Sequence, residues 1–221
     1  MNREATPYLA ELLGTFGFVF IGAGSVAINN LTGGTLGLPG IALAHGLALL
    51  AFIYAFSHVS GAHFNPAVTI AFWLIKKIEG PVAVGYIIAQ LTGAFLAGIF
   101  IEGLLGGALQ SVPQPVKIDS PSAILIEALL VFFLVLVIFG TTVDRRSHTS
   151  HAGIAIGFVF TILVLLGFEL TGAALNPARA FGPALVANFW DHHLIYWSGP
   201  ILGALIAALV YEYGILRSNK D

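Results

Sequence analysis

Two Asn-Pro pairs interrupt the hydrophobic sequence of this chain. The stretch "SGAHFNPAVT" contains Asn65 and Pro66, and "TGAALNPARA" contains Asn176 and Pro177. Asparagine is a favoured helix N-cap, and proline suits the first helical position because its missing N–H would have no partner there. Each pair therefore predicts a helix start. The capping amide can still donate to a solute, and the helix dipole adds positive potential at the same point.

Three charged residues lie inside hydrophobic sequence, where a charge usually indicates function. Arg179 follows the second Asn-Pro pair and could donate to a passing solute while repelling cations. Glu11 and Glu127 allow two interpretations. They could relay protons, as buried carboxylates do in transporters. They could instead accept hydrogen bonds from loop N–H groups, which cost several kcal/mol each when unpaired in hydrocarbon. We favour the second interpretation.

Two histidines near these motifs are further candidates. His45 precedes Asn65 by 20 residues, so it either lines the same site or is a core histidine bonded to a backbone carbonyl. His63 directly adjoins the first motif, and we expect it to face the cytoplasmic vestibule. The sequence contains no metal-ligand cluster, nucleophile elbow or phosphate loop, and it has no cysteine. We therefore expect no enzyme activity, no metal and no cofactor.

The composition indicates a membrane protein. Of the 221 residues, 57% are hydrophobic and 9% are charged, and the mean hydropathy is +0.93. Soluble domains carry about 25% charged residues, so this chain cannot cover a water-exposed surface. The few basic residues form no stripe that could bind nucleic acid. We expect a lipid bilayer as the surroundings and small solutes as partners.

Six stretches are long enough to cross a bilayer, which takes about 20 residues. They cover about residues 7–29, 39–58, 82–105, 121–142, 152–169 and 193–215. Two further hydrophobic pieces, about 65–75 and 176–187, are too short to span, and each starts at an Asn-Pro pair. Short pieces of this kind are typical of re-entrant segments.

Basic residues predict the orientation, because they concentrate on the cytoplasmic side. Seven basic residues are expected on one side of the membrane, and Lys117 alone is expected on the other side. Arg179 is left out of this count because it belongs to one of the two short hydrophobic pieces. Both termini are therefore expected in the cytoplasm. The cytoplasmic set consists of Arg3, Lys76, Lys77, Arg145, Arg146, Arg217 and Lys220.

The chain also repeats itself. A shift of 111 residues aligns the two Asn-Pro motifs and places Gly46 on Gly157, while Glu11 corresponds to Glu127 at a shift of 116. Each half, about 1–110 and 120–221, holds three spans and one short helix, so the second half must enter from the opposite side. The predicted fold is an all-α membrane protein with an inverted repeat, forming a single channel domain.

If both short helices start near the midplane, their loops line the same passage. Irregular backbone at membrane depth is tolerated where it lines a water-filled cavity. The loop carbonyls would then form a row of acceptors for a neutral solute. These pore-lining positions are Gly61, Ala62, His63, Gly172 and Ala174.

At these residues the chain resembles the aquaporin family, also called the major intrinsic proteins. The resemblance covers nearly the whole chain: six spans, the acids in spans 1 and 4, and two motifs, Asn65-Pro66-Ala67 and Asn176-Pro177-Ala178. It implies a passive channel that conducts water and excludes protons and ions. It also implies a homotetramer in the cell membrane, with one pore per subunit.

The same resemblance implies a selectivity filter of four residues: His45, Val164, Ala173 and Arg179. Many water-specific members have Phe at the first place and His at the second. Here His and Val occupy them, which is similar to the plant tonoplast subgroup. A smaller side chain at the second place widens or reshapes the lane, so ammonia or other small neutral solutes become candidate substrates.

Two alternatives remain open. The first is a glycerol facilitator, although Ala180, Ala184 and the Tyr196-Trp197 pair stand where the glycerol branch typically has other residues. The second is a proton-coupled secondary transporter that would use Glu11 and Glu127.

Overall fold

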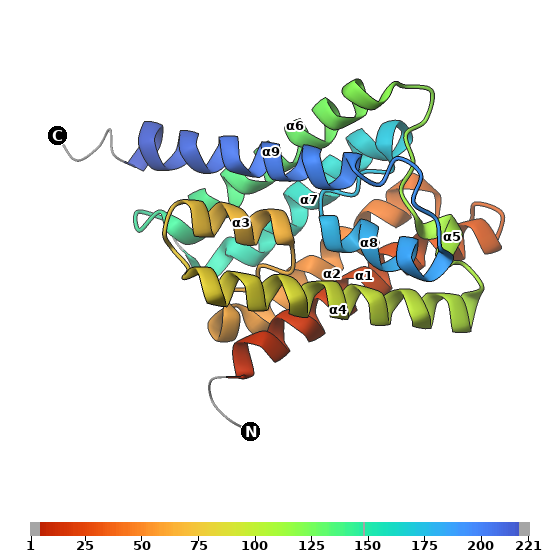
Figure 1. Cartoon of the computed structure of the whole chain (residues 1–221), viewed down its shortest axis with the longest axis horizontal. Helices are drawn as coiled ribbons and strands as arrows, with labels where there is room; N and C mark the ends of the chain where they lie inside the picture. The colour runs from red at the N-terminus through yellow and green to blue at the C-terminus, as the bar shows by residue number, and fades with distance from the viewer. Residues whose placement is uncertain (1–4, 148, 217–221) are drawn as a thin grey trace.

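The computed structural model describes residues 5–147 and 149–216, and every regular element in that part of the chain is helical (Figure 1). The elements are, in order, α1 (Thr6–Leu31), α2 (Gly37–Ser60), α3 (Pro66–Leu74), α4 (Gly80–Leu105), α5 (Ala108–Ser111), α6 (Ser120–Ile138), η1 (Phe139–Val143), η2 (Thr149–His151), α7 (Ala152–Thr171), α8 (Pro177–Ala187), α9 (Ile195–Leu209) and η3 (Val210–Leu216).

Within residues 5–147 and 149–216, six helices are long and hydrophobic enough to cross a membrane, as the sequence predicts. They are α1, α2, α4, α6 continued by η1, α7, and α9 continued by η3. The last span begins at Ile195 and not at 193, because His192 takes a left-handed conformation with φ of 57° and turns the chain. The one-turn helix α5 was not predicted, and it lies in the loop between α4 and α6.

The ends of several helices follow from local sequence. Proline takes one of the first two positions of α1, α3, α4, α6 and α8, where its missing N–H leaves no bond unmade. The spans α2 and α7 end at Gly61 and Gly172, which have φ of 88° and 77°. This left-handed conformation is the one glycine adopts without strain. The chain then turns into the two loops that carry the Asn-Pro motifs.

The two halves pack in the same way. Helix α1 lies against α4, as α6 lies against α9, and each half-helix also packs on the last span of the other half: α3 on α9 and α8 on α4. Figure 1 shows α3 and α8 in the middle of the molecule, flanked by longer helices. The predicted fold class, six spans with two re-entrant half-helices in an inverted repeat, is confirmed.

Helices α2 and α7 cross at the repeat-related glycines. A Cβ atom on Gly46 would collide with the carbonyl oxygen of Gly157 and the hydroxyl of Thr161. A Cβ on Gly157 would in turn lie 2.7 Å from the carbonyl oxygen of Gly46. The absence of side chains therefore lets the two backbones touch, as small residues do in membrane helix pairs.

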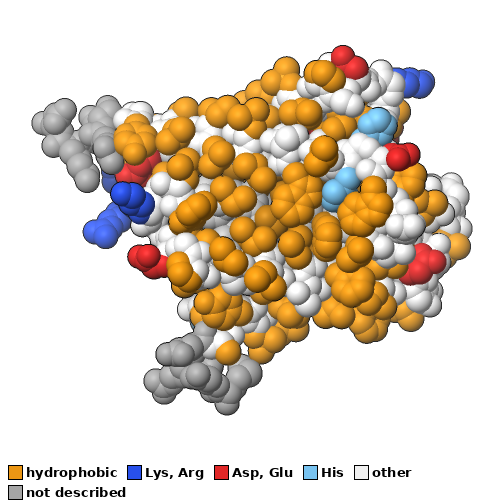
Figure 2. All heavy atoms as spheres, viewed as in Figure 1, with side chains coloured by type: hydrophobic (Ala, Val, Ile, Leu, Met, Phe, Trp, Pro, Cys, Tyr) orange, Lys and Arg blue, Asp and Glu red, His pale blue; other side chains and the backbone are white. Residues whose placement is uncertain are grey.

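The surface matches a membrane-spanning protein. In Figure 2, hydrophobic side chains cover the visible face between the two ends of the long axis, and charged side chains gather at those ends. Lys77 pairs with Glu212 of η3 at 4.0 Å. Arg146 pairs with Asp144, which also accepts a hydrogen bond from Tyr211 of η3. Lys77 and Arg146 therefore share one end of the molecule, whereas Arg3, Arg217 and Lys220 of the predicted set lie outside the described residues.

Candidate solute pathway

The two Asn-Pro motifs meet in the middle of the molecule. The Asn65 side-chain oxygen accepts from the N–H of Ala67, and the Asn176 oxygen accepts from the N–H of Ala178, both at 2.9 Å. Each asparagine also donates across the repeat. Asn65 Nδ2 lies 2.9 Å from the carbonyl oxygen of Leu175, and Asn176 Nδ2 lies 2.8 Å from that of Phe64. An amide has two N–H groups, so each side chain keeps one hydrogen for another partner.

The loop before α3 is strained and braced. Ala62 and Phe64 have φ of 55° and 49°, values that cost non-glycine residues energy. Glu11, which is fully buried, accepts from the N–H groups of His63 at 2.9 Å and Phe64 at 2.7 Å. The hydroxyl of Ser60 accepts from the N–H of Ala62 and donates to Glu11. Three consecutive loop N–H groups are therefore paired.

The loop before α8 repeats this arrangement. Ala173 and Leu175 have φ of 41° and 54°. The buried Glu127 accepts from the N–H groups of Ala174 at 3.0 Å and Leu175 at 2.9 Å. Thr171 takes the place of Ser60, since its hydroxyl accepts from Ala173 and donates to Glu127. These contacts are the ones that the bracing interpretation of the two acids requires.

These side chains pair three consecutive N–H groups in each loop, and the loop carbonyls stay available. Within residues 5–147 and 149–216, none of the carbonyl oxygens of residues 61–63 and 172–174 accepts a hydrogen bond from the protein. A free carbonyl at membrane depth needs a polar partner. A solute in the pathway can provide one.

A polar chain connects the first loop to its acid. Gln90 Nε2 donates to Glu11 at 2.8 Å and to the Thr69 hydroxyl at 2.9 Å. That hydroxyl lies 3.1 Å from Nδ1 of His63. Because Thr69 accepts from Gln90, its own hydrogen is available for Nδ1, which would leave the proton of His63 on Nε2. His63 would then present a donor to the cavity that it lines.

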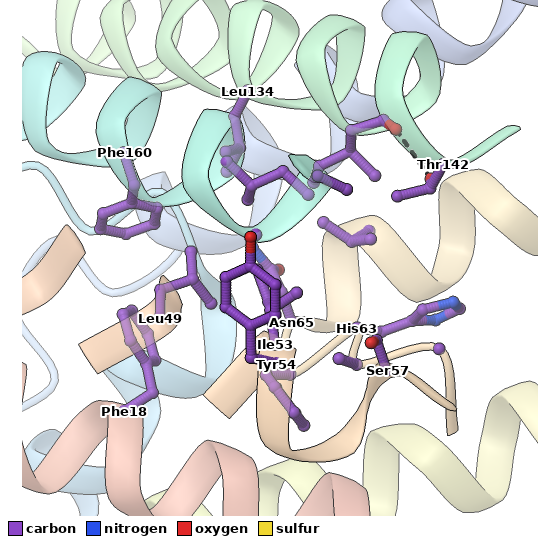
Figure 3. Close-up of a pocket in the computed structure, with 18 of the residues that line it drawn as sticks. Phe18, Leu49, Ile53, Tyr54, Ser57, His63, Asn65, Leu134, Thr142 and Phe160 are labelled. Atoms are coloured by element: carbon purple, nitrogen blue, oxygen red, sulfur yellow. Dashed lines mark hydrogen bonds between the residues drawn. The ribbon is translucent and has the colours of Figure 1, made fainter. Parts of the chain in front are cut away.

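Two cavities lead toward the asparagine pair. The larger one, about 400 Å³, is lined by loop residues 61–65, by Asn176 and by hydrophobic side chains of four spans. Figure 3 shows Phe18, Leu49 and Phe160 at one end of this cavity and His63 and Thr142 at the other. The second cavity, about 250 Å³, lies on the opposite side of the molecule. Gly172, Arg179 and residues of the α4–α6 loop line it.

Arg179 lines the second cavity, and His45 lines neither cavity. Both side chains are buried. Arg179 Nη1 donates to the carbonyl oxygen of Ser111 in α5 at 3.0 Å, and His45 Nδ1 lies 2.9 Å from the carbonyl oxygen of Ile41. Since that carbonyl can only accept, Nδ1 carries the proton and Nε2 is a bare acceptor. Among the described residues, neither Arg179 Nε nor His45 Nε2 has a partner.

Ile41, whose carbonyl accepts from His45, lines the same cavity as Arg179. The pair therefore leaves one unpaired donor and one unpaired acceptor in the same buried region. Buried polar atoms are nearly always paired in native proteins, so both atoms need a partner that the chain does not provide.

The remaining predicted filter residues, Val164 and Ala173, are also buried. Neither of them lines either cavity, so their role in a filter stays a prediction. The sequence-based prediction missed three supporting residues: Ser60, Thr171 and Ser111. Ser60 and Thr171 could have been found, because they are the first residues of the two repeated motifs. The contact of Ser111 with Arg179 has no such signal.

Comparison with known proteins places this chain in a family. The model of the family described as "Major intrinsic protein" matches residues 3–211. The chain is 41% identical over 235 residues to "Aquaporin AqpM" of Methanothermobacter thermautotrophicus, covering 93% of this chain and 95% of that protein. It is 43% identical over 227 residues to "Probable aquaporin TIP3-2" of Arabidopsis thaliana, covering 96% and 85%.

A solved structure shows the same fold. The X-ray structure of the aquaglyceroporin from Plasmodium falciparum superposes with a TM-score of 0.85 and 27% sequence identity. The superposition covers 97% of this chain and 98% of the other. With the family model, the relatives and the structural neighbour in agreement, this chain belongs to the major intrinsic protein family.

Proposed function

We propose that this chain conducts water down an osmotic gradient, through a lane between Asn65 and Asn176, and excludes protons and ions. The general part of this function follows from the family, whose members are passive channels and not enzymes. The chain is thus a multi-pass membrane protein and a passive channel for small solutes. The choice of water as substrate is the proposal.

The unpaired polar atoms of Arg179 and His45 support the proposal most directly. Arg179 Nε offers a donor and His45 Nε2 offers an acceptor, and both are buried without a protein partner among the described residues. Water is the smallest neutral molecule that both accepts and donates hydrogen bonds. It can satisfy both atoms as it passes and then leave.

The asparagine pair supports the exclusion of protons. Each side chain keeps one free N–H, and both donors project from helix starts that carry positive dipole ends. A water molecule that accepts from both must point its own hydrogens outward, toward the two cavities. A proton arriving from either side would meet no acceptor there. Arg179 adds a positive charge that repels cations.

A second candidate substrate class, other small neutral solutes, is favoured by Val164. The residue is small and apolar at the place where many water-specific members have His. Ammonia can both donate and accept and is close to water in size, so it fits the same pair of unpaired atoms. Glycerol is larger, and the fold neighbour that is named an aquaglyceroporin keeps it among the solutes to test.

Proton-coupled transport is disfavoured by the contacts of the two acids. Both oxygens of Glu11 and both of Glu127 accept hydrogen bonds from the loops. A relay would have to break these bonds at each step and would release the strained loops. We also propose a homotetramer in the cell membrane, a single channel domain per chain, and both termini in the cytoplasm.

The test is stopped-flow light scattering on vesicles that contain the purified protein, with protein-free vesicles as control. Water permeability should exceed that of the control by about an order of magnitude, with or without a proton gradient. Ammonia and glycerol are measured on the same vesicles. A permeability equal to the control for all three solutes, or flux that requires the gradient, would refute the proposal.

A further inference from the structure

We propose that Phe160 sets the size limit of the lane, and that its ring occupies space which the small Val164 leaves open. The inference rests on the proposed function, because it concerns which solutes pass the same lane. It goes beyond the four filter residues that the family resemblance implies. If it is correct, a solute wider than water is stopped at Phe160, although the filter position itself carries Val.

The first observation is where the cavities end. The two cavities share no lining residue within the described chain. Phe18 and Phe160 line the inner end of the larger cavity (Figure 3). Any solute that leaves this cavity toward Arg179 must therefore pass these two rings.

The second observation is how closely the rings pack. The ring centroids of Phe18 and Phe160 are 5.3 Å apart at an interplanar angle of 85°. His45 stacks on Phe160 at 6.2 Å and 13°, and it meets Phe18 at 6.2 Å and 73°. Separations of this size are those of rings in direct contact. No solute fits between the rings, so the lane must pass beside them.

The third observation is the position of Phe160 along α7. It precedes Val164 by four residues, which is about one helical turn or 6 Å. Residues four apart lie on the same face of a helix, and both are buried, with exposed fractions of 1% and 0%. The phenyl ring therefore lies directly before the valine along the same wall of the lane. The small side chain of Val164 therefore has the large side chain of Phe160 one helical turn away on the same wall.

The repeat shows that the ring is not required by the fold. The 111-residue shift that relates the two motifs pairs Phe160 with Leu49 of α2. Leu49 lines the same cavity, yet it is aliphatic and smaller. A leucine-sized side chain is thus compatible with this position of the repeat. The phenyl ring on α7 narrows the lane from one side, where a leucine would leave more room.

The consequence is a separation of two tasks. Arg179, His45 and the asparagines provide the hydrogen bonds and the positive potential, whereas Phe160 limits the width. Removing the ring should admit wider neutral solutes without admitting protons. This separation makes the inference testable with substitutions that leave the polar residues in place.

The experiment compares Phe160→Val and Phe160→Ala with the unmodified protein in vesicles. Glycerol permeability should rise about tenfold or more, the order of change that a few missing methylenes cause in a size-selecting pocket. Water permeability should stay the same or rise, and proton leak should not change. Phe158→Val is the matched control, because Phe158 lies on the same helix with 53% of its surface exposed. It should alter none of these rates.

Each outcome has a defined meaning. Suppose that the unmodified protein conducts water and that the Phe160 variants exclude glycerol as completely as the unmodified protein. The inference is then wrong, and the proposed function stands. The inference also fails if the unmodified protein already passes glycerol as fast as the variants. If no vesicle conducts water, the proposed function fails. Should Phe160→Val not fold, Phe160→Leu keeps most of the volume and should show a smaller rise, while an unchanged rate would overturn the inference.

Discussion

Two buried acids in this protein act by fixing the backbone of the loops to which they are hydrogen-bonded. Glu11 and Glu127 are buried, and each accepts from two consecutive N–H groups of a strained loop. The loops then keep their carbonyls free and bring Asn65 and Asn176 into contact with the opposite loop. At this scale, a change of one atom in an acid should affect the whole pathway.

Replacing Glu127 by Gln tests this role. The side chain keeps its shape, but one acceptor oxygen becomes an NH₂ group that faces a backbone N–H. A buried donor without a partner costs about 1–3 kcal/mol, so the thermal unfolding temperature in detergent should fall and water flux should fall with it. Glu169→Gln is the control, because Glu169 is exposed near the end of the same span as Thr171. Equal stability of both variants would contradict the bracing role.

Replacing Arg179 by Val tests the proposed barrier to ions. The variant loses the charge and the unpaired Nε donor, so protons and small cations should leak into vesicles. Each 1.4 kcal/mol of lost repulsion raises the leak about tenfold. The measurement is the decay of a pH gradient, followed with an internal dye. Arg145→Val, in the exposed turn after η1, should leave the gradient intact, and an equally stable gradient in both variants would refute the assignment.

At the scale of elements, close helix crossings position the site. Helices α2 and α7 carry His45 and Val164, and they touch through Gly46 and Gly157. The distance between the two helices therefore fixes the distance between opposite walls of the proposed lane. At the end of the molecule that we expect in the cytoplasm, a hydrogen bond from Tyr211 of η3 to Asp144 ties the chain after α6 to the last span.

Gly46→Ala should separate α2 from α7. The added Cβ would overlap the Gly157 backbone oxygen and the Thr161 hydroxyl, and overpacking of this kind costs about 1–3 kcal/mol. A lower unfolding temperature is expected, together with altered solute selectivity. Gly103→Ala is the control, since a Cβ there meets nothing within 4 Å. A variant at Gly46 as stable as the control would show that the crossing tolerates a side chain.

Asp144→Asn should make stability less dependent on acid pH. Hydrogen bonds from Arg146 hold the pKa of the Asp144 carboxyl below its ordinary value of 3.8. A depressed pKa in the folded state means that the stabilisation is present above 3.8 and is lost as the pH falls below it. The unmodified protein should therefore be more stable than the variant near neutral pH, and this difference should shrink in acid. Unfolding curves at a series of pH values measure this difference in stability, and Asp191→Asn serves as the control variant.

The whole molecule presents a hydrophobic surface between two charged ends (Figure 2). Hydrophobic residues on its outer helix faces, such as Leu43, Ile162 and Leu166, are exposed by 45–65%. In a membrane this surface meets lipid or another copy of the chain. The proposed homotetramer would bury part of it between subunits, while each subunit keeps its own lane.

Native mass spectrometry of the detergent-purified protein tests the oligomeric state. The expected species is four copies of the 23.3 kDa chain. Water permeability per chain should not depend on neighbours, because every residue of the proposed lane comes from one chain. A monomer with full permeability would contradict the tetramer but not the channel.

The sequence predicted the features that depend on short segments or on periodicity. Hydrophobic runs of sufficient length gave the six spans, since the bilayer fixes the length required. The Asn-Pro pairs gave the two half-helix starts, because capping depends on a few adjacent residues. The internal repeat, together with an odd number of spans per half, gave the inverted arrangement.

The tertiary structure alone decided which side chains from distant segments meet. Only the folded chain shows that Ser111 anchors Arg179 and that Phe160 packs on Phe18. The same is true of the His45 nitrogen that no other described residue pairs. These contacts depend on how closely and at what angle the helices cross, and many crossings satisfy the same hydrophobic pattern. The sequence determined that a polar lane can exist in this protein, and the packing of α1, α2 and α7 decides the width of the lane that we propose.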